Sequence, residues 1–492
     1  MSEASPDHDP SLDAIDPLDS PDAGGRAIRG VAVRTILFGA GLLLNLAAVP
    51  FMIRHLGPVD YGYYITVASI VFLVGAVTEA GLTNLGVRHW AAGDTEDRRE
   101  MVRNLIGLRL ALTLAGLLLA TAIAAIAGAP RIIVAGTFVY GLGLLVSMIA
   151  YTYAVPLAAS LRLGTTSALD FLRQALLAIG TLVLVVAGAK LIGFFALWVV
   201  VSAFAVAATA LIVRGEISIR PAFDRRRWLD FLRQSIAYSI AAAVGLIYFR
   251  VAVVSISALS TDLEAGYYAA PFRIIETAAT IPWMFVTSVF PILARAATRD
   301  TERLRYAVQR VTEVGLIVGV WMTLVLVVAA RPAVEVIGGL PEFTPSIPVL
   351  RLQALTLVST FLVATWSLLL LSLHQHRTLL IANAFAVVVA VIAAVLLIPP
   401  MGAEGGALTT IIAETFLAVA YIVAQRRSHP EISVALGVLP KLALAAGLGG
   451  AIVLAPLPDL VQAVIFSVVY LGALLAMRAV PFEVFSALRS RV

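Results

Sequence analysis

The feature that most constrains this chain is a series of apolar runs, each about 20 residues long, that recurs from residue 31 to residue 480. The hydrocarbon core of a bilayer is about 30 Å thick, which an α-helix of that length can cross. Lipid offers the backbone no hydrogen-bond partners, so helices are the expected spanning form. Apolar residues make up 60% of the 492 residues, charged residues make up 13%, and the mean hydropathy is +0.96. The sequence therefore predicts an all-α polytopic membrane protein.

Charged or Pro/Gly-rich joints divide the chain into about fourteen expected transmembrane helices. Each expected helix is the apolar stretch between two such joints. The expected ranges are 31–53, 61–82, 102–128, 131–155, 167–189, 191–213, 230–259, 265–293, 307–330, 348–373, 378–399, 403–425, 433–455 and 459–480.

The distribution of Lys and Arg predicts how these helices are oriented. Short cytoplasmic loops of membrane proteins are enriched in basic residues. Alternate joints of this chain differ in the same way: joints and tails on one side hold most of the 35 basic residues, and only Arg250 and Arg273 are assigned to the interior of spans. The joints on the other side hold Arg54, Arg131, Lys190, Arg331 and Arg351. We therefore expect a cytoplasmic-membrane protein with both termini in the cytoplasm.

The remaining compositional features limit the partners and cofactors. The basic residues behind the net charge of +5 are spread over short joints, so we expect contact with anionic lipid headgroups and not with nucleic acid. The chain has no cysteine, which excludes disulfides and cysteine-ligated metal sites. Residues 1–25 contain seven acidic side chains, four prolines and no Lys or Arg, which predicts a disordered cytoplasmic tail. We expect no metal and no cofactor.

Two short motifs occur twice. GYY begins at Gly62 and again at Gly266, and DTE begins at Asp94 and again at Asp300. GYY opens the second and the eighth expected span, so an even number of spans separates the two copies. This predicts a parallel repeat whose halves are related by an axis along the membrane normal. The alternative is that short apolar sequences match by chance.

The repeat predicts two lobes of six helices each, followed by a helix pair with no counterpart. In transporters built from such repeats, the substrate path lies between the halves. The expected units are the tail at 1–25, the first lobe at 26–215, the second lobe at 216–430, and the appended helix pair with the C-terminus at 431–492.

Several segments carry a resemblance to a known family. They are RHLGPVDYGYY through EAGLTNLGVRHWA, then AGYYAAPFRIIETAATIPWMFVTSVFPILAR, and above all IANAFAVVVAVIAAVLLIPPMGAEGGALTTIIAE. Over nearly the whole chain they resemble the Wzx-like polysaccharide-biosynthesis flippases of the multidrug/oligosaccharidyl-lipid/polysaccharide (MOP) superfamily. The resemblance implies export of a lipid-linked oligosaccharide by alternating access, for the synthesis of a lipopolysaccharide or exopolysaccharide. It also implies glycosyltransferases and a polymerase of the same pathway as partners.

The most specific part of this resemblance is a block that runs from an asparagine to a series of glycines. Asn383, Pro399, Gly402 and Gly405 resemble the N…IP-x-G-x-x-G pattern of the family, with one more residue between Pro399 and the first glycine. Proline removes a backbone donor and glycine permits close helix approach, so the block is interpreted as a fold signature more than as a site.

Ionisable residues inside the spans are the candidates for substrate contact, because a charge there costs about 2.5–3.5 kcal/mol on insertion scales. Arg250 and Arg273 are expected at similar depths in neighbouring spans, where their guanidinium groups suit the phosphate or pyrophosphate of a lipid-linked sugar. Glu276 lies three residues after Arg273 on the same helical face, so this pair can instead neutralise itself. Tyr248 and Phe249 precede Arg250, where relatives often carry an acidic residue.

Five other ionisable residues receive weaker assignments. Arg34, Glu79 and Arg88 lie towards the cytoplasmic ends of the first two spans, and we interpret them as a structural ion pair or as part of an inner entrance. Glu313 and Glu414 are candidates for ion coupling, with Glu414 inside the fold-signature block.

Two other functions remain as alternatives to the flippase. A drug or cation antiporter of the same superfamily would favour a cavity lined by carboxylates. An O-antigen ligase or polymerase would need a large outer loop with catalytic residues, and the longest outer joint, near 331–347, is too short for one. The sequence contains no P-loop and no H-E-x-x-H motif, so we expect no enzymatic activity.

Overall fold

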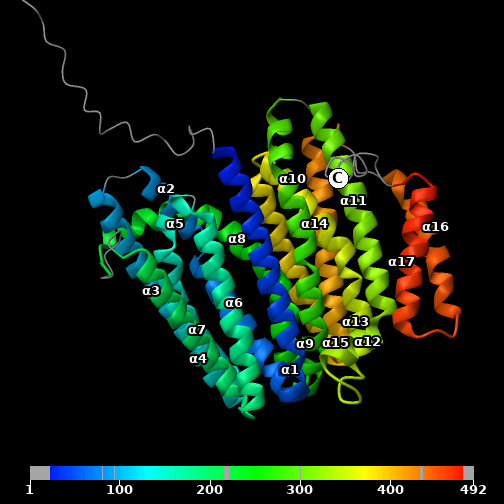
Figure 1. Cartoon of the computed structure of the whole chain (residues 1–492), viewed down its shortest axis with the longest axis horizontal. Coiled ribbons are helices and arrows are strands. Elements are labelled where there is room, and N and C mark those ends of the chain that lie inside the picture. Colours follow the sequence, from blue (N-terminus) through cyan, green and yellow to red (C-terminus); the bar gives the residue numbers. More distant parts are fainter. Residues whose placement is uncertain are drawn as a thin grey trace, which may run out of the picture.

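The computed structural model of the chain describes residues 23–79, 81–92, 95–160, 162–214, 221–299, 301–432 and 436–479. Within these ranges the elements are α-helices and short 3-10 helices (Figure 1). They are α1 (Ala23–Glu79), α2 (Leu82–Ala92), α3 (Thr95–Ile126), α4 (Arg131–Tyr153), α5 (Val155–Ala159), α6 (Leu163–Val186), α7 (Leu191–Ile212), α8 (Arg225–Leu259), α9 (Asp262–Ala278), α10 (Thr280–Arg299), α11 (Thr301–Val328), α12 (Ala330–Ile337), α13 (Ser346–Ala354), α14 (Thr356–Ser372), α15 (His376–Ser428), η2 (Leu436–Val438), α16 (Leu439–Gly450), η3 (Ala451–Leu454) and α17 (Asp459–Ala476).

The all-helical prediction is confirmed. Ten continuous helices are long and apolar enough to cross a membrane within the described ranges. Two of these, α1 and α15, each join two of the expected spans. Helix α8 contains one expected span and α16 lies within another, but neither is among the ten. The count of fourteen crossings stays a prediction. Most of the expected tail lies outside the described residues, and residues 23–25 are already helical.

Glycines produce the kinks in the two longest helices. Gly57 in α1 has φ +70° and Gly402 in α15 has φ +55°, a left-handed region that glycine enters without steric cost. Pro58 follows the first kink and Pro399 precedes the second, and each lacks the N–H that a continuous helix would use. Each pair of expected spans is therefore joined by a sharp bend and not by a loop.

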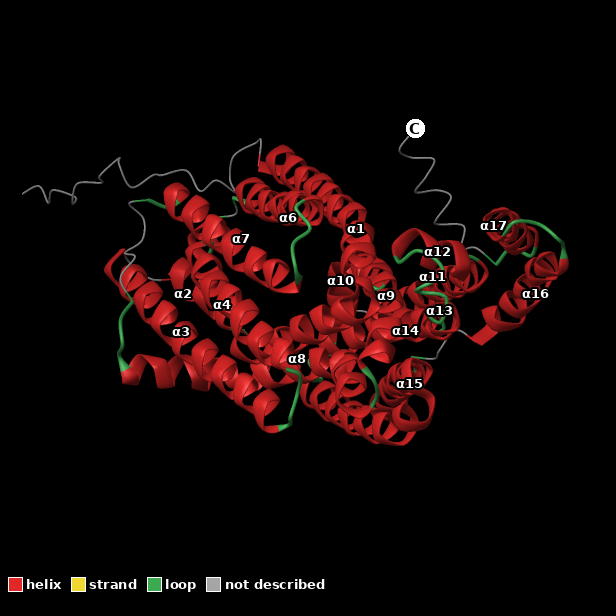
Figure 2. Cartoon of the chain, turned by 90° about the horizontal axis from the view of Figure 1, so that it is seen from below, coloured by secondary structure: helices red, strands yellow, loops and turns green. Residues whose placement is uncertain are grey.

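The helices form two groups, with α16 and α17 at one edge. In Figure 2, α3, α4 and α7 gather on one side, which we call the first helix group. Helices α11, α13, α14 and α15 gather on the other side, which we call the second helix group. Helix α1 packs against α6 of the first group and against α9 of the second, and α8 packs along α15 and also contacts α1. Helices α16 and α17 pack on each other and against α11. The groups therefore meet along α1, α8 and α9.

The two repeated glycines meet where α1 crosses α9. A Cβ added to Gly266 would lie 2.0 Å from the carbonyl oxygen of Pro58, and one added to Gly62 would lie 2.8 Å from the backbone nitrogen of Gly266. Only residues without a side chain permit so close a crossing. Asp94 and Asp300, which mark the second repeated motif, lie outside the described residues.

Polar contacts join the two groups near this crossing, at the lower end of the molecule in Figure 1. The hydroxyl of Tyr63 on α1 donates a hydrogen bond to Asp262, the first residue of α9. Arg54 on α1 donates to the carbonyl oxygens of Glu335 and Val336 near the end of α12, both at 2.8 Å. A cation at the C-terminal end of a helix is favoured by the helix dipole. These contacts hold the two groups together at one end.

The bend in α15 brings its two halves into close contact. A Cβ added to Gly405 would lie 2.2 Å from the carbonyl oxygen of Leu397, in the preceding half. The carboxylate of Glu264 on α9 accepts a hydrogen bond of 2.7 Å from the backbone N–H of Ala403. This N–H would otherwise be left without a partner at the start of the second half. The bend thus depends on glycines and on a cap supplied by another helix.

Candidate functional site

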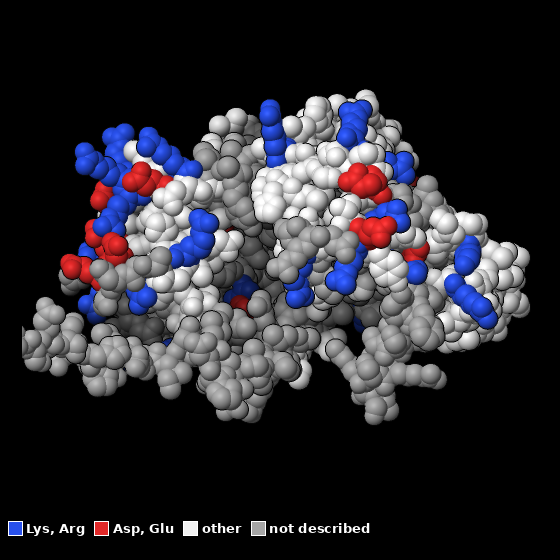
Figure 3. Space-filling view, turned by 90° about the horizontal axis from the view of Figure 1, so that it is seen from above, with Lys and Arg blue, Asp and Glu red and all other residues white. Residues whose placement is uncertain are grey.

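A cavity of about 240 Å³ lies between the two helix groups. Helices α1, α4, α6 and α7 supply one wall, and α8 and α9 supply the other. Figure 3 looks onto the upper end of the molecule and shows a hollow near the middle of this face, with a basic and an acidic group at its bottom. The residues that line the cavity are Asn45, Ala48, Val49, Met52, Tyr61, Tyr64, Ile65, Ala68, Phe72, Tyr140, Leu177, Ala178, Thr181, Phe194, Leu197, Trp198, Arg250, Arg273 and Glu276.

Arg250, Arg273 and Glu276 form one charged cluster in this cavity. Nη1 of Arg273 lies 2.9 Å from Oε2 of Glu276, and Nη2 of Arg250 pairs with Oε1 of the same carboxylate. The spacing of three residues on α9 places Arg273 beside Glu276, and the packing of α8 against α9 adds Arg250. The structure thus brings together all three residues that the sequence assigned to the cavity.

The cluster is also bonded to α1, on the other side of the cavity. Nη2 of Arg273 donates to Oδ1 of Asn45 at 2.9 Å, and Nη1 of Arg250 donates to Oγ of Ser69 at 3.2 Å. Sequence reasoning missed both partners. An asparagine inside the apolar run GAGLLLNLAAVP was a usable signal for Asn45, whereas nothing in the sequence distinguishes Ser69.

The two arginines differ in their accessibility. Arg250 is only 9% exposed, and its guanidinium carbon lies 4.6 Å from the ring centroid of Phe72 and 5.2 Å from that of Phe272. Cation–π contacts of this kind hold a guanidinium group in place. The side chain of Arg273 is 30% exposed. Arg273 is therefore the arginine that a ligand in the cavity can reach, and Arg250 supports it through Glu276.

The cluster has a net charge of +1, because two guanidinium groups share one carboxylate. Arginine stays protonated in proteins, and two neighbouring cations favour the ionised form of the carboxyl group. An excess positive charge between low-dielectric walls attracts an anion. Planar guanidinium groups bind carboxylate and phosphate oxygens in pairs, so the site suits a ligand with such a group.

Tyr64, Tyr140 and Trp198 line the wall supplied by α1, α4 and α7, and the buried Phe195 packs against Tyr64. The rings of Tyr64 and Phe195 stack with centroids 5.9 Å apart, and those of Tyr140 and Trp198 stack at 5.5 Å. Tyr64 also meets Tyr140 edge to face at 6.1 Å. Large rings with a polar edge offer both apolar contact and hydrogen bonding. These residues come from three different helices, which is why no local sequence pattern pointed to them.

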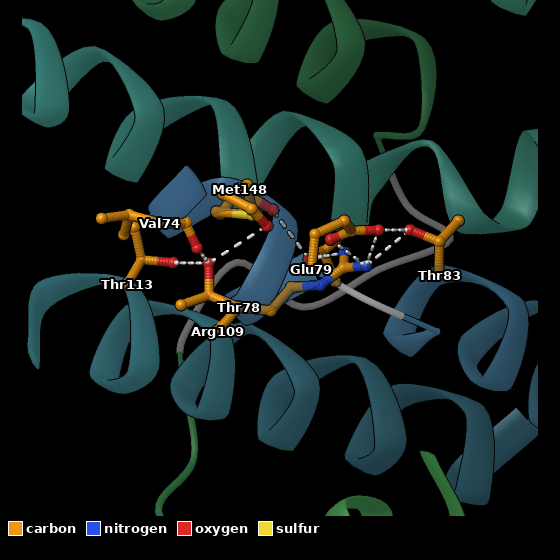
Figure 4. A network of polar contacts seen from close by, with 9 residues as sticks. Val74, Thr78, Glu79, Thr83, Arg109, Thr113 and Met148 are labelled. Atoms are coloured by element: carbon orange, nitrogen blue, oxygen red, sulfur yellow. Dashed lines mark hydrogen bonds and ion pairs between the residues drawn. The ribbon is translucent and has the colours of Figure 1, made fainter. Parts of the chain in front are cut away.

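Glu79 does form an ion pair, but its partner is Arg109 of α3. Nη2 of Arg109 lies 2.8 Å from Oε2 of Glu79, and Arg109 also donates to the hydroxyls of Thr83 at 2.6 Å and Thr152 at 2.7 Å. Figure 4 shows this network. Arg109 is fully buried. The assignment of interior charge to Arg250 and Arg273 alone is therefore wrong, because Arg109 lies inside the first helix group, as does Arg173 on α6.

The other two members of the expected inner-entrance group do not join Glu79 in the part of the chain that the structure describes. Arg88 is exposed on α2, which is separate from α1. The side chain of Arg34 lies outside the described residues, although its backbone belongs to α1. The position of Glu79 thus favours the structural ion pair over the entrance, with a partner that the sequence did not indicate.

The two coupling candidates have different surroundings. Glu313 on α11 pairs with Arg310 at 2.8 Å, and its side chain is 12% exposed. Glu414 on α15 is 1% exposed and accepts a hydrogen bond of 3.2 Å from the hydroxyl of Tyr248, whereas its second carboxyl oxygen has no hydrogen-bond partner. Among the described residues no cation pairs with Glu414. Of the two, Glu414 is therefore the one whose ionisation is not offset by a neighbour.

Asn383 connects the two halves of α15 next to this carboxyl group. Its side-chain nitrogen donates to the hydroxyl of Tyr421 at 2.9 Å and to the carbonyl of Leu379 at 2.8 Å. Both bonds lie within α15, so the asparagine of the signature block acts on helix packing in this structure. In the described ranges, no group of three His, Cys, Asp or Glu is placed to hold a metal ion.

A family model described as polysaccharide biosynthesis protein matches residues 27–297. No curated protein sequence matches the chain.

Solved structures share the fold. The lipid II flippase MurJ in an inward closed conformation matches with a TM-score of 0.75 and 14% identity, over 91% of this chain and 98% of that chain. An inward-facing MATE-family multidrug resistance transporter of the MOP superfamily matches with a TM-score of 0.64 and 15% identity, over 81% and 98%. An outward-facing MATE transporter matches with a TM-score of 0.56 and 17% identity, over 82% and 95%. At these identities the matches show a common fold.

Proposed function

Since the chain belongs to the polysaccharide biosynthesis protein family, we propose that it is a flippase that moves a lipid-linked oligosaccharide across the cytoplasmic membrane. The observation that carries this proposal is the net-positive cluster of Arg250, Arg273 and Glu276 in the cavity between the two helix groups. A polyprenyl phosphate or diphosphate supplies the anionic oxygens that such a cluster binds. The MurJ-like and MATE-like fold supports a transport role.

The bonds of the cluster suggest how binding is linked to movement. Both Nη atoms of Arg273 are in use, one on Glu276 and one on Asn45 of α1. A phosphate that binds Arg273 from the cavity competes with Asn45, which removes one of the bonds between α9 and α1. Substrate binding then favours a different arrangement of the two groups, as alternating access requires.

Two energy sources are compatible with this site. Moving two negative charges outwards across an inside-negative membrane gains roughly 4–5 kcal/mol per 100 mV, so the membrane potential alone can bias export of a diphosphate. The second source that we propose is a proton or cation gradient, coupled to transport through Glu414. A buried carboxyl group without a neighbouring cation either binds a proton or binds another cation. Glu414 lies on α15 in the second helix group, where it accepts a hydrogen bond from Tyr248 of α8.

The architecture that we propose is a parallel repeat with both termini in the cytoplasm. Residues at equivalent positions near a twofold axis contact each other, and the close crossing of Gly62 with Gly266 fits that relation. Glycosyltransferases that build the lipid-linked sugar would supply the substrate, and a polymerase would consume it. The appended α16 and α17 lie at the edge, where they pack against α11.

Substitution of the two arginines tests the proposal. We expect Arg273→Ala to abolish most export of the lipid-linked precursor at matched protein abundance, and Arg250→Ala to reduce it. Lysine at either position should restore part of the activity, because it keeps the charge but loses the bidentate fork. Arg377→Gln, at an exposed position on α15, is the matched control for loss of one positive charge. Unchanged export in both alanine variants would remove the cluster from the mechanism.

A transport assay also separates the flippase from the antiporter. An antiporter for organic cations would need an accessible carboxylate, and the carboxylate in the cavity, Glu276, is already shared by two arginines. We expect vesicles that contain the protein to move a lipid-linked diphosphate sugar and to leave a cationic dye in place. Dye transport that depends on Glu276 or Glu414 would instead favour the antiporter.

A further inference from the structure

A second cavity, of about 450 Å³, adjoins the central one inside the first helix group. Ala68, Phe72, Tyr140 and Trp198 line both cavities. Most of the remaining wall is aliphatic, but Arg173 of α6 reaches it. The aromatic wall of the central site therefore continues towards a further arginine.

A third cavity, of about 280 Å³, continues from the second, and Glu79, Tyr151 and Arg173 line both. Arg173 thus lies where the second and third cavities meet. It precedes Leu177, which lines the central cavity, by four residues on α6. That spacing corresponds to one helical turn, or roughly 6 Å along the helix axis.

The contacts of Arg173 leave part of its guanidinium group unused. Nη1 donates to the hydroxyl of Tyr151 at 3.3 Å, and the guanidinium carbon lies 5.6 Å from the ring centroid of Trp198. Nε is buried and has no hydrogen-bond partner. Two aromatic side chains therefore orient this arginine, and one of its buried donors is unsatisfied.

Arg173 also lacks a counter-charge within the described part of the chain. Glu79, which lines the same two cavities, pairs with Arg109 at 2.8 Å. Asp170 lines the third cavity but forms no ion pair with Arg173, and it is exposed. Arg173 is partly exposed, so an anion that enters these cavities can reach its guanidinium group. The cation can therefore take a counter-charge that the described chain does not supply.

We propose that Arg173, oriented by Tyr151 and Trp198, is a second oxyanion subsite, which holds the charged headgroup of the transported lipid before that group reaches Arg273. This inference rests on the proposed flippase function and extends it to a new residue. Helix α6 begins on the side predicted to be cytoplasmic. A headgroup that enters from there therefore meets Arg173 one helical turn before it reaches Leu177 and the central cavity. The three cavities then form a path along the first helix group towards the charged cluster.

Two groups on the substrate have the required chemistry, namely the lipid phosphate or diphosphate and the carboxylate of an acidic sugar. Both present oxygens that a guanidinium group binds in pairs. Binding experiments with defined lipids distinguish them. The probes are polyprenyl diphosphate without sugar, polyprenyl diphosphate with one neutral sugar, the same lipid with one uronic acid, and uncharged polyprenol.

The measurement uses the full chain in lipid nanodiscs. Trp198 touches Arg173 and lines two of the cavities, so its fluorescence should change when a ligand enters. Trp198→Phe identifies the part of the signal that comes from this residue. We expect polyprenyl diphosphate to change the Trp198 signal and polyprenol to leave it unchanged. Arg173→Gln should raise the Kd about tenfold, the effect of losing one charge-assisted interaction.

Further variants separate binding from structural support. Arg173→Lys should recover part of the affinity, and Arg377→Gln should bind like the unmodified protein. If Arg173 were only structural, the glutamine variant would unfold at a lower temperature while its folded fraction kept normal affinity, which would overturn the proposal. If only the lipid with uronic acid responds to Arg173→Gln, the subsite binds the sugar carboxylate.

The outcome also distinguishes this inference from the proposed function. Normal binding and export in Arg173→Gln, together with lost export in Arg273→Ala, would overturn the subsite and leave the flippase assignment intact. Weakened oxyanion binding in Arg173→Gln, with no transport of any lipid-linked sugar by the unmodified protein, would support the subsite and overturn the flippase.

Discussion

Arg109 and Arg273 both belong to helices that lie within the apolar body of the protein, yet they have different surroundings. Arg109 is fully buried, with Glu79 and two threonine hydroxyls as partners. Arg273 lines a cavity with its side chain 30% exposed. A buried charge whose counter-charge is supplied by the chain stabilises one arrangement of helices, whereas an accessible one can exchange a partner for a ligand. The same residue type thus serves structure in one place and binding in another.

The pairing of Arg109 predicts a stability effect. Arg109→Met leaves Glu79 without its cation, and breaking a buried pair costs about 3 kcal/mol or somewhat less here, because Glu79 keeps 30% exposure. We expect a lower unfolding temperature in detergent than for the unmodified protein. The double variant Glu79→Gln with Arg109→Met should recover part of the loss. A loss for the double variant equal to the sum of the losses for Glu79→Gln and Arg109→Met alone would show that the pair is not coupled.

At the scale of elements, the two kinked helices depend on glycine for different reasons. Gly57 has a positive φ, but open space surrounds the position of an added Cβ. Gly402 also has a positive φ, and its Cβ would lie 2.5 Å from the Glu264 carboxylate that accepts the N–H of Ala403. The kink at Gly57 therefore requires glycine only for its backbone conformation. The kink at Gly402 also requires space for the Glu264 carboxylate that caps the second half of α15.

Alanine substitutions should separate these two requirements. A positive φ with an extended ψ costs a residue with a Cβ roughly 1–3 kcal/mol, so Gly57→Ala should lower the unfolding temperature. Gly402→Ala should lower it further, because it also displaces the cap. Gly447→Ala on α16 is the control: this glycine is helical and has open space, so alanine should be neutral or slightly stabilising. Similar losses for Gly57→Ala and Gly402→Ala would contradict the role of the Glu264 cap.

At the scale of the whole molecule, one end is held together and the other is hollow. Tyr63 bonds to Asp262 beside the crossing of α1 with α9, and Figure 3 shows the hollow on the opposite face. For a transporter whose site lies between two groups of helices, such an arrangement gives access from one side. Transport then requires the contacts near this crossing, such as the one between Tyr63 and Asp262, to separate.

A reversible cross-link tests this requirement. The chain has no cysteine, so Tyr63→Cys with Asp262→Cys introduces the only two thiols. We expect a short bifunctional thiol reagent to stop export by joining α1 to α9, and a reductant to restore it. Each single cysteine variant, treated in the same way, is the control. Full export by protein with a confirmed cross-link would show that these helices need not separate.

The orientation of the whole chain is testable in the same cysteine-free background. Lys190 and Arg377 are both exposed, and the charge distribution predicts them on opposite sides of the membrane. In intact cells, an impermeant thiol reagent should label Lys190→Cys but label Arg377→Cys only after lysis. A reporter fused to the C-terminus should be active in the cytoplasmic format. The reverse labelling pattern would overturn the predicted orientation.

The sequence predicted some residues of the candidate site and missed others. It grouped Arg250 with Arg273 and Glu276, because helix spacing and depth along a span are properties of the local sequence. It did not find Asn45 or Ser69, because hydrogen bonds across the cavity depend on how α1 faces α8 and α9. It did not single out Arg109, although this residue falls within the expected span 102–128, because its burial depends on three neighbouring helical segments.

The amino-acid sequence alone establishes that this is an all-helical membrane protein, because hydrophobicity over about 20 residues decides what enters a bilayer. It also determined that few charges lie inside, and that Arg273 and Glu276 share a helix face. Which charges are neutralised and which remain open to a ligand depends on how the helices pack. Glu79 pairs with Arg109, whereas Arg173 has no counter-charge in the described chain. Lateral packing brings together residues from distant segments, and neither hydropathy nor helical spacing carries that information.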